Sequence, residues 1–281
     1  MRSISKVKIR KIIKKNVFEV EDSLVTEEPL EIRIGFCELE KRLQKSISVT
    51  MRTPGNDFEL AAGFLFTEGI IHKKEDILKI NYVPNFDKKS AQNIVKIELS
   101  PDLDFDSKKL ERNFYMTSSC GVCGKASIEA VYSNEIPEIN PQKPVFRASE
   151  ILKLPEILLQ KQNVFESTGG LHAAALFNSK SELIEIKEDI GRHNAVDKLI
   201  GSELLKNRLP LSDFLILVSG RAGFELVQKS VMAGIPILAA VGAPSELSRQ
   251  LAEESGMTLI GFLKNDRFNI YTNAERIDFD N

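Results

Sequence analysis

Cysteine is scarce in this 281-residue sequence, and the numbers of basic and acidic residues are nearly equal. Three cysteines, two of them close together, do not build the disulfide framework of a small secreted domain. A formal net charge of −2 at pH 7 argues against a general nucleic-acid binder. No apolar run approaches the ~20 residues of a transmembrane helix, and the basic start lacks the apolar core of a signal peptide. We therefore expect a cytoplasmic globular protein that binds neither nucleic acid nor membrane.

The second half of the chain alternates short apolar runs with helical patterns. Residues 214–218, 235–241 and 257–262 have the continuous apolar character of buried strands. Helical patterns over residues 224–232 and 244–255 separate them, the second with proline at its start and glycine after its end. Strands that are apolar on both faces and alternate with helices predict an α/β fold with a largely parallel sheet between two helical layers.

The first part of the chain has a different pattern. Residues 31–34, 46–50 and 93–99 alternate like strands, and residues 58–69 form a helical pattern that ends at a glycine. The polar stretch over residues 101–112 predicts a boundary between a smaller N-terminal α+β domain, residues 1–110, and an α/β domain, residues 111–281. We expect the basic segment near the start to be an edge strand, and Cys37 to be a small buried hydrophobe.

A C-x-x-C motif marks the middle of the chain, where Cys120 and Cys123 stand among small residues and precede Lys125. Gly121 and Gly124 allow a tight turn, and the helix-forming residues that follow place the pair at a helix N-terminus. A helix dipole and a nearby lysine both favour the thiolate, the nucleophilic form of cysteine. The motif alone is compatible with a redox couple, half of a zinc site or a sulfur carrier.

Three loops that follow predicted strands carry polar and small residues, over residues 188–194, 219–223 and 242–245. In an open α/β sheet, ligands bind beyond the carboxyl ends of the strands. Backbone N–H groups at helix starts, with Arg192, Ser219 and Arg221, suit a phosphate or another anion. We expect His193 to be a functional donor or proton carrier there, and His172 to be a core residue.

Two other enzyme classes use a C-x-x-C pair. A zinc deaminase needs H-x-E followed by P-C-x-x-C, but no proline precedes Cys120 and no glutamate stands two residues after His172 or His193. A thioredoxin-like oxidoreductase has its pair after an early strand in a small domain, whereas this pair lies in the middle of a long chain. The sequence therefore favours neither class, and we expect no metal held by protein side chains.

Several motifs taken together resemble the FdhD family of formate dehydrogenase accessory sulfurtransferases. Their residues run in order along nearly the whole chain: 29–32, 53–55, 59–65, 68–71, 118–124, 168–172, 188–195, 197–198, 219–221 and 262–267. The resemblance implies a cytidine-deaminase-like α/β/α core that has lost zinc chemistry, often in a homodimer. It also implies sulfur transfer from a cysteine desulfurase to the molybdenum cofactor of formate dehydrogenase, a bis(molybdopterin guanine dinucleotide).

The same resemblance implies roles for particular residues. Cys120 would carry the sulfur as a persulfide, with Cys123 as its companion. Part of the site for the cofactor and its guanine nucleotide would come from one stretch, Phe262, Leu263, Lys264, Asn265, Asp266 and Arg267. The family often has arginine where this chain has Lys264, which keeps the charge but not the planar fork of donors. A chaperone that only holds the cofactor is the alternative, but it would not need the cysteine pair.

Overall fold

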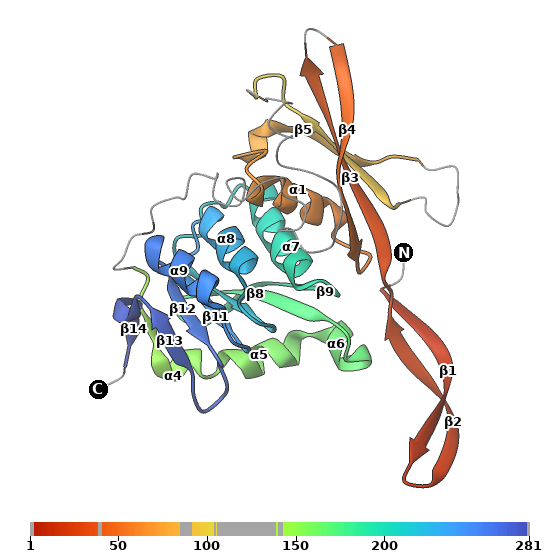
Figure 1. Cartoon of the computed structure of the whole chain (residues 1–281), viewed down its shortest axis with the longest axis vertical. Coiled ribbons are helices and arrows are strands. Elements are labelled where there is room, and N and C mark those ends of the chain that lie inside the picture. Colours follow the sequence, from red (N-terminus) through yellow and green to blue (C-terminus); the bar gives the residue numbers. More distant parts are fainter. Residues whose placement is uncertain are drawn as a thin grey trace.

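A six-stranded mixed sheet forms the centre of the protein, in a computed structural model that describes residues 3–38, 41–84, 92–103, 105, 139 and 143–279 (Figure 1). The strand order is β13-β12-β11-β10-β8-β9, with β8 (His172–Asn178), β9 (Leu183–Asp189), β10 (Phe214–Val218), β11 (Ile237–Ala240), β12 (Thr258–Gly261) and β13 (Asn269–Thr272). Only β10, β11 and β12 are mutually parallel. Short connections make β9 antiparallel to β8 and β13 antiparallel to β12, and β8 is also antiparallel to β10. The expectation of a largely parallel sheet was therefore wrong for these outer strands.

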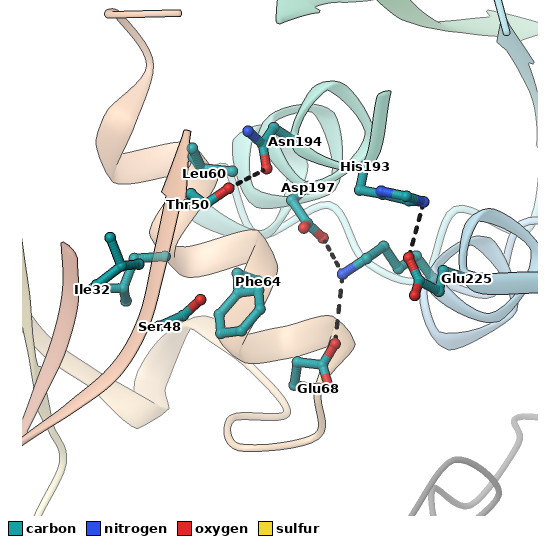
Figure 2. Close-up of a pocket in the computed structure, with 12 residues that line it drawn as sticks. Ile32, Ser48, Thr50, Leu60, Phe64, Glu68, His193, Asn194, Asp197 and Glu225 are labelled. Carbon is teal, nitrogen blue, oxygen red and sulfur yellow. Dashed lines mark hydrogen bonds and ion pairs between the residues drawn. The ribbon is translucent and has the colours of Figure 1, made fainter. Parts of the chain in front are cut away.

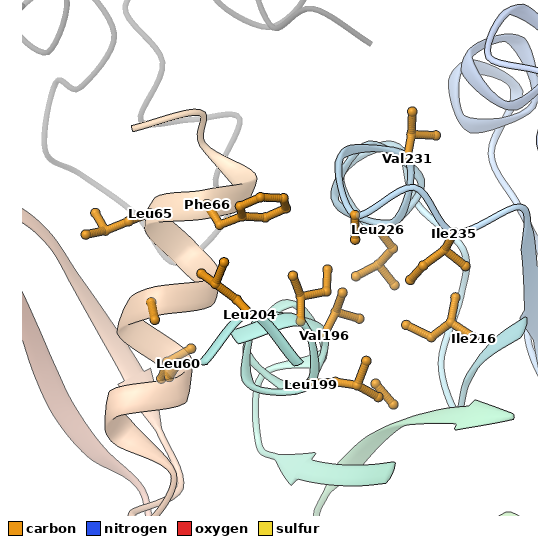
Figure 3. Close-up of a cluster of buried hydrophobic side chains, with 14 of the residues drawn as sticks. Leu60, Leu65, Phe66, Val196, Leu199, Leu204, Ile216, Leu226, Val231 and Ile235 are labelled. Carbon is orange, nitrogen blue, oxygen red and sulfur yellow. The ribbon is translucent and has the colours of Figure 1, made fainter. Parts of the chain in front are cut away.

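Helices cover both faces of this sheet. On one face lie α7 (Arg192–Leu205), α8 (Phe224–Met232) and α9 (Glu246–Glu254), as predicted, and on the other lie α4 (Ala148–Ile151) and α5 (Leu154–Lys161), followed by α6 (Asn163–Thr168) (Figure 1). Alternate residues of the same strands face the two layers: Ile216 packs toward α7 and α8, whereas Leu215 and Leu217 pack with Leu154 of α5 (Figure 3). The α/β/α layering predicted from the sequence is confirmed, and its relation to cytidine deaminases stays a prediction.

A second, four-stranded sheet lies on the outer side of α1 (Asp57–Thr67), in the order β4-β3-β6-β5. Its strands are β3 (Glu28–Glu38), β4 (Lys41–Arg52), β5 (Ile77–Tyr82) and β6 (Ile94–Leu99), with the short helix η1 (Lys74–Asp76) before β5. Buried side chains of β3, α1, α7 and β10 form one continuous core (Figure 3). The α1–α7 contact is close because Gly63 and Gly201 lie in it; a Cβ at either would come within 1.9 Å of the other helix's backbone.

The chain starts with a two-stranded antiparallel ribbon, β1 (Ile4–Ile13) and β2 (Asn16–Val25), which projects away from the rest of the protein (Figure 1). The sequence pattern predicts the strand β1, whereas it did not indicate β2. At the other end, β14 (Ile277–Asp278) pairs with β7 (Phe146–Arg147) after the short helix η4 (Ala274–Arg276). None of the described helices is long and apolar enough to cross a membrane.

The expectation for Cys37 was wrong, because its side chain is exposed. The β3–β4 hairpin extends beyond the core at this point, and an Arg42 nitrogen lies 3.8 Å from the Cys37 sulfur. The predicted domain boundary at residue 110 falls outside the described residues and stays a prediction.

Candidate functional site

The loops that follow the three parallel strands meet at one end of the six-stranded sheet. Gly242, after β11, donates from its backbone N–H to Gly220 O, after β10, at 3.0 Å. Phe262, after β12, donates in turn to Gly242 O at 3.0 Å. The start of β8 joins the same end, since Ala173 N donates to Ser219 Oγ at 2.9 Å. We call this region the strand-end site; the sequence predicts that the loops over residues 219–223 and 242–245 lie at one edge of the sheet, and the fold places them side by side.

The strand-end site is rich in cationic side chains. Arg221, Lys264 and Arg267 are exposed, and none of them forms an ion pair with another described residue. Arg192 begins α7 beside Gly220, and its Nε atom is buried without a hydrogen-bond partner in the described part of the chain. An unpartnered guanidinium N–H is costly to bury, so an anion that accepts a hydrogen bond from it would gain affinity.

His172 opens β8 opposite Asp189 of β9 and lies next to Gly220 and Arg192. Its ring makes no hydrogen bond with any of the residues that the structure describes. Burial lowers the pKa of His172 below its usual value, and the positive charges of Arg192 and His193 lower it further, against the opposing effect of Asp189. The surroundings of the imidazole therefore favour its neutral form. Sequence reasoning had assigned this histidine to the core.

His193, expected at the anion site, instead pairs with α8. Its Nε2 atom lies 2.9 Å from Glu225 Oε2, and its ring faces a cavity between α7 and α8 (Figure 2). Leu263 is also turned away from the strand-end site, because its side chain is fully buried in the core under the sheet. Phe262 is exposed and has a left-handed backbone with φ of 53°.

A buried ion pair between Lys198 and Asp189 holds the loop between β9 and α7. Lys198 Nζ lies 2.6 Å from Asp189 Oδ2 and donates to Thr53 O at 2.8 Å. Asp189 also accepts hydrogen bonds from Thr53 N, Gly191 N and Asn194 Nδ2. Much of the polar motif over residues 188–198 therefore fixes the first turn of α7 against the turn before α1, whereas Arg192 lies beside Gly220 at the strand-end site.

The cavity shown in Figure 2 has a volume of about 470 Å³ including its open mouth, and its walls come from β3, β4, α1, α7 and α8. Lys229 Nζ in its wall lies 2.9 Å from Asp197 Oδ1, donates a hydrogen bond to Thr67 Oγ1 at 2.9 Å and lies 3.7 Å from Glu68 Oε1. Burial lowers the pKa of Lys229, but Asp197 and Glu68 outweigh burial, so the pKa is raised and the amine stays charged. These ionic contacts of one amine with two carboxylates join α1, α7 and α8; no pattern in the sequence indicated Lys229.

Cys120 and Cys123 lie outside the described residues, as does Lys125. Among the residues that the structure does describe, no three histidine, cysteine, aspartate or glutamate side chains gather into a group that could hold a metal ion.

Comparison with known proteins identifies the family. The FdhD/NarQ family matches residues 25–278. A protein of Mycolicibacterium paratuberculosis named "Sulfur carrier protein FdhD" is 52% identical over 260 residues, covering 91% of this chain and 92% of the relative. Proteins with the same name from Mycobacterium tuberculosis and Sulfurisphaera tokodaii are 46% and 42% identical, and each match covers at least 96% of both chains.

A crystal structure gives the same result at the level of the fold. A protein of Desulfotalea psychrophila, provisionally described as a formate dehydrogenase accessory protein, superposes with a TM-score of 0.76 and 25% identity over 99% of this chain and all of that one. The matches in sequence and in structure span nearly the whole chain, and the family resemblance seen in the motifs is confirmed. The chain belongs to the FdhD/NarQ family.

Proposed function

We propose that this chain is a sulfur carrier that serves formate dehydrogenase. It accepts sulfur from a cysteine desulfurase as a persulfide on Cys120 and passes it to the molybdenum cofactor before that cofactor enters the enzyme. The names of the relatives support a general role in carrying sulfur for formate dehydrogenase. The sequence relatives are named sulfur carrier proteins, and the structural neighbour is described as a formate dehydrogenase accessory protein. The persulfide relay, the cofactor and both protein partners are parts of the proposal.

The observation that carries the proposal is the strand-end site combined with the cysteine pair. A guanine dinucleotide cofactor presents phosphates, which suit the exposed Arg221 and Arg267 and the unpartnered Nε of Arg192. Phe262 is exposed at the same end of the sheet and offers an aromatic face to the guanine base. The cofactor is cargo here, and the protein's own task is to hold it while sulfur arrives.

The chemistry of the first transfer needs only thiolate exchange. The Cys120 thiolate attacks the terminal sulfur of the desulfurase persulfide, and the desulfurase cysteine leaves as a thiolate. One sulfur atom changes carrier, and no external oxidant is required. Cys123 then has an assisting or protecting role, since its thiolate could close a disulfide with Cys120 and release the carried sulfur as hydrosulfide.

A mass measurement tests the sulfur relay. The full-length protein is incubated with a cysteine desulfurase and cysteine, and we expect a gain of one sulfur mass that peptide mapping locates on Cys120. The variant Cys120→Ala should lose the gain and the activation of formate dehydrogenase, whereas Cys123→Ala should have a milder effect. Full activation by Cys120→Ala would refute the assignment.

The alternative function is a chaperone that binds the cofactor without carrying sulfur. The two functions share the strand-end site and differ only in the need for the cysteines. If Cys120→Ala binds the cofactor normally and also activates formate dehydrogenase, the chaperone function is correct. If it binds the cofactor and fails to activate the enzyme, sulfur transfer is correct.

Calorimetry tests the strand-end site separately. We expect GDP to bind, and Arg221→Ala or Arg267→Ala to weaken it by roughly ten- to a hundredfold, because a charge-assisted hydrogen bond contributes about 1.5–3 kcal/mol. ADP is the control for preference of the base. Lys153→Ala, on the exposed surface of the helical segment 148–161, is the control for loss of a positive charge. Equal binding by the wild type and both arginine variants would place the phosphates elsewhere.

A further inference from the structure

Two side chains with unused hydrogen-bonding groups lie together at the strand-end site. The His172 ring is partly buried and makes no hydrogen bond with any described residue, and the Nε atom of Arg192 is buried without a partner in the same part of the chain. A neutral imidazole has one N–H donor and one acceptor nitrogen, and burying such groups unpaired costs free energy. Both groups would gain from a ligand that reaches them.

The backbone of Gly220 brings the two side chains to a common space. A Cβ atom at Gly220 would lie 3.4 Å from His172 Nδ1 and 3.8 Å from Arg192 Cδ. Glycine leaves this position empty, so the imidazole and the stem of the arginine flank the same side of the backbone. An anion that accepts a hydrogen bond from Arg192 therefore lies close to the His172 ring.

The carboxylate opposite His172 does not bind the ring. Asp189 is paired with His172 across β8 and β9, but its Oδ2 atom lies 2.6 Å from Lys198 Nζ. Two backbone N–H groups and a side-chain amide also donate to the Asp189 oxygens. The negative charge of Asp189 is therefore largely neutralised by its own partners, and the ring keeps its nitrogens for another group.

The other charged groups near the ring are cationic. Burial holds the pKa of His172 below its usual value, and Arg192 and His193 at the start of α7 lower it further. His193 lies 2.9 Å from Glu225, and the loop after β10 adds the exposed Arg221 to the same end of the sheet. A bound anion would offset these positive charges and so remove the main electrostatic obstacle to a protonated ring.

We propose that His172 is a proton-accepting ligand of the anion at the strand-end site. As the anion binds, the ring takes up one proton from the solvent, and the imidazolium donates an N–H to an anion oxygen; no covalent bond forms or breaks. This inference rests on the anion site of the proposed function and adds a residue and a proton to it. Because binding consumes a proton, the affinity for the anion rises as the pH falls toward the pKa of the free ring.

NMR titration of the full-length wild type tests the protonation directly, with GDP as the probe. The chain has three histidines, so the ring signals can be followed one by one. Saturation with GDP should raise the pKa of His172 by about one unit or more, because an opposite charge within ~4–6 Å favours the charged form. His72, which is exposed between α1 and η1, should keep its pKa and is the internal control.

Calorimetry tests the coupling to affinity. Titrations with GDP in two buffers of different ionisation enthalpy give the number of protons taken up. The terminal phosphate of GDP itself titrates at about pH 6, so the comparison is between variants. His172→Gln keeps an N–H donor but cannot be protonated, and it should take up about half a proton less than the wild type or fewer still at pH 7. Its affinity should also rise less between pH 8 and pH 6, whereas His72→Gln should match the wild type.

The outcomes separate this inference from the proposed function. If GDP binds and the His172 pKa is unchanged or falls, the inference is overturned while the strand-end site stands. Equal proton uptake by the wild type and His172→Gln has the same consequence. If the wild type does not bind GDP, the strand-end site is refuted together with the role of His172.

Discussion

The buried ion pair between Lys198 and Asp189 allows a quantitative prediction of the free energy of unfolding. Their side chains are 2% and 0% exposed, and their charged atoms are 2.6 Å apart. Replacing Lys198 by methionine keeps the unbranched apolar stem of the side chain up to Cε but leaves a buried carboxylate without its counter-ion, which typically costs about 3–5 kcal/mol. Asp189 keeps three hydrogen bonds, from Thr53 N, Gly191 N and Asn194 Nδ2, at 2.8–3.1 Å. We therefore expect the lower end, a loss of about 3 kcal/mol in the free energy of unfolding.

Urea denaturation measures this loss as a fall in the transition midpoint with an unchanged slope. The control is Lys153→Met, whose amine pairs with Glu150 at the surface with 60% of the side chain exposed, and it should cost below ~0.5 kcal/mol. The double variant Asp189→Asn/Lys198→Met removes both charges and should recover part of the loss. A loss below ~1 kcal/mol for Lys198→Met, or a loss equal to that of the control, would refute the reasoning about an uncompensated buried charge.

Three further predictions concern packing and titration. Gly201→Ala places a Cβ 1.9 Å from a backbone oxygen of α1 and should destabilise the protein by about 3 kcal/mol in urea denaturation. Gly223→Ala, at the N-cap of α8 with open space around its Cβ, should cost only about 0.5–1 kcal/mol. Burial and the nearby Asp57 carboxylate raise the pKa of Tyr82 to about 12. The contribution of the neutral Tyr82 side chain to stability is therefore complete below about pH 10 and is lost as the pH rises toward 12. In an ultraviolet titration of the protein, the tyrosinate step at the highest pH should be missing from the variant Tyr82→Phe. The His172 ring should titrate below its usual pKa in NMR spectra, and Arg192→Ala should raise that pKa; an unchanged value would contradict the assigned electrostatic cause.

The elements of the second half were predictable because each carries a local signal. The sequence predicted a helix over residues 224–232, and α8 has those bounds. Continuous apolar runs predicted β10, β11 and β12, since a strand buried on both faces carries mainly apolar side chains. The candidate loops were also found in this way, because glycine and charged residues at strand ends stand out from the apolar runs before them.

The tertiary structure alone decided which polar side chains face solvent and which are buried and paired with other side chains. His172 and His193 look alike in the sequence, but the strand pairing places His172 at the strand-end site, and the first turn of α7 directs His193 to Glu225. Lys198 and Lys229 carry the same charge as Arg221, yet partners from distant parts of the chain bury both lysines. Burial of a charge depends on contacts across more than a hundred residues, which no local pattern encodes, whereas a strand or a helix depends on its own side chains and the water around them.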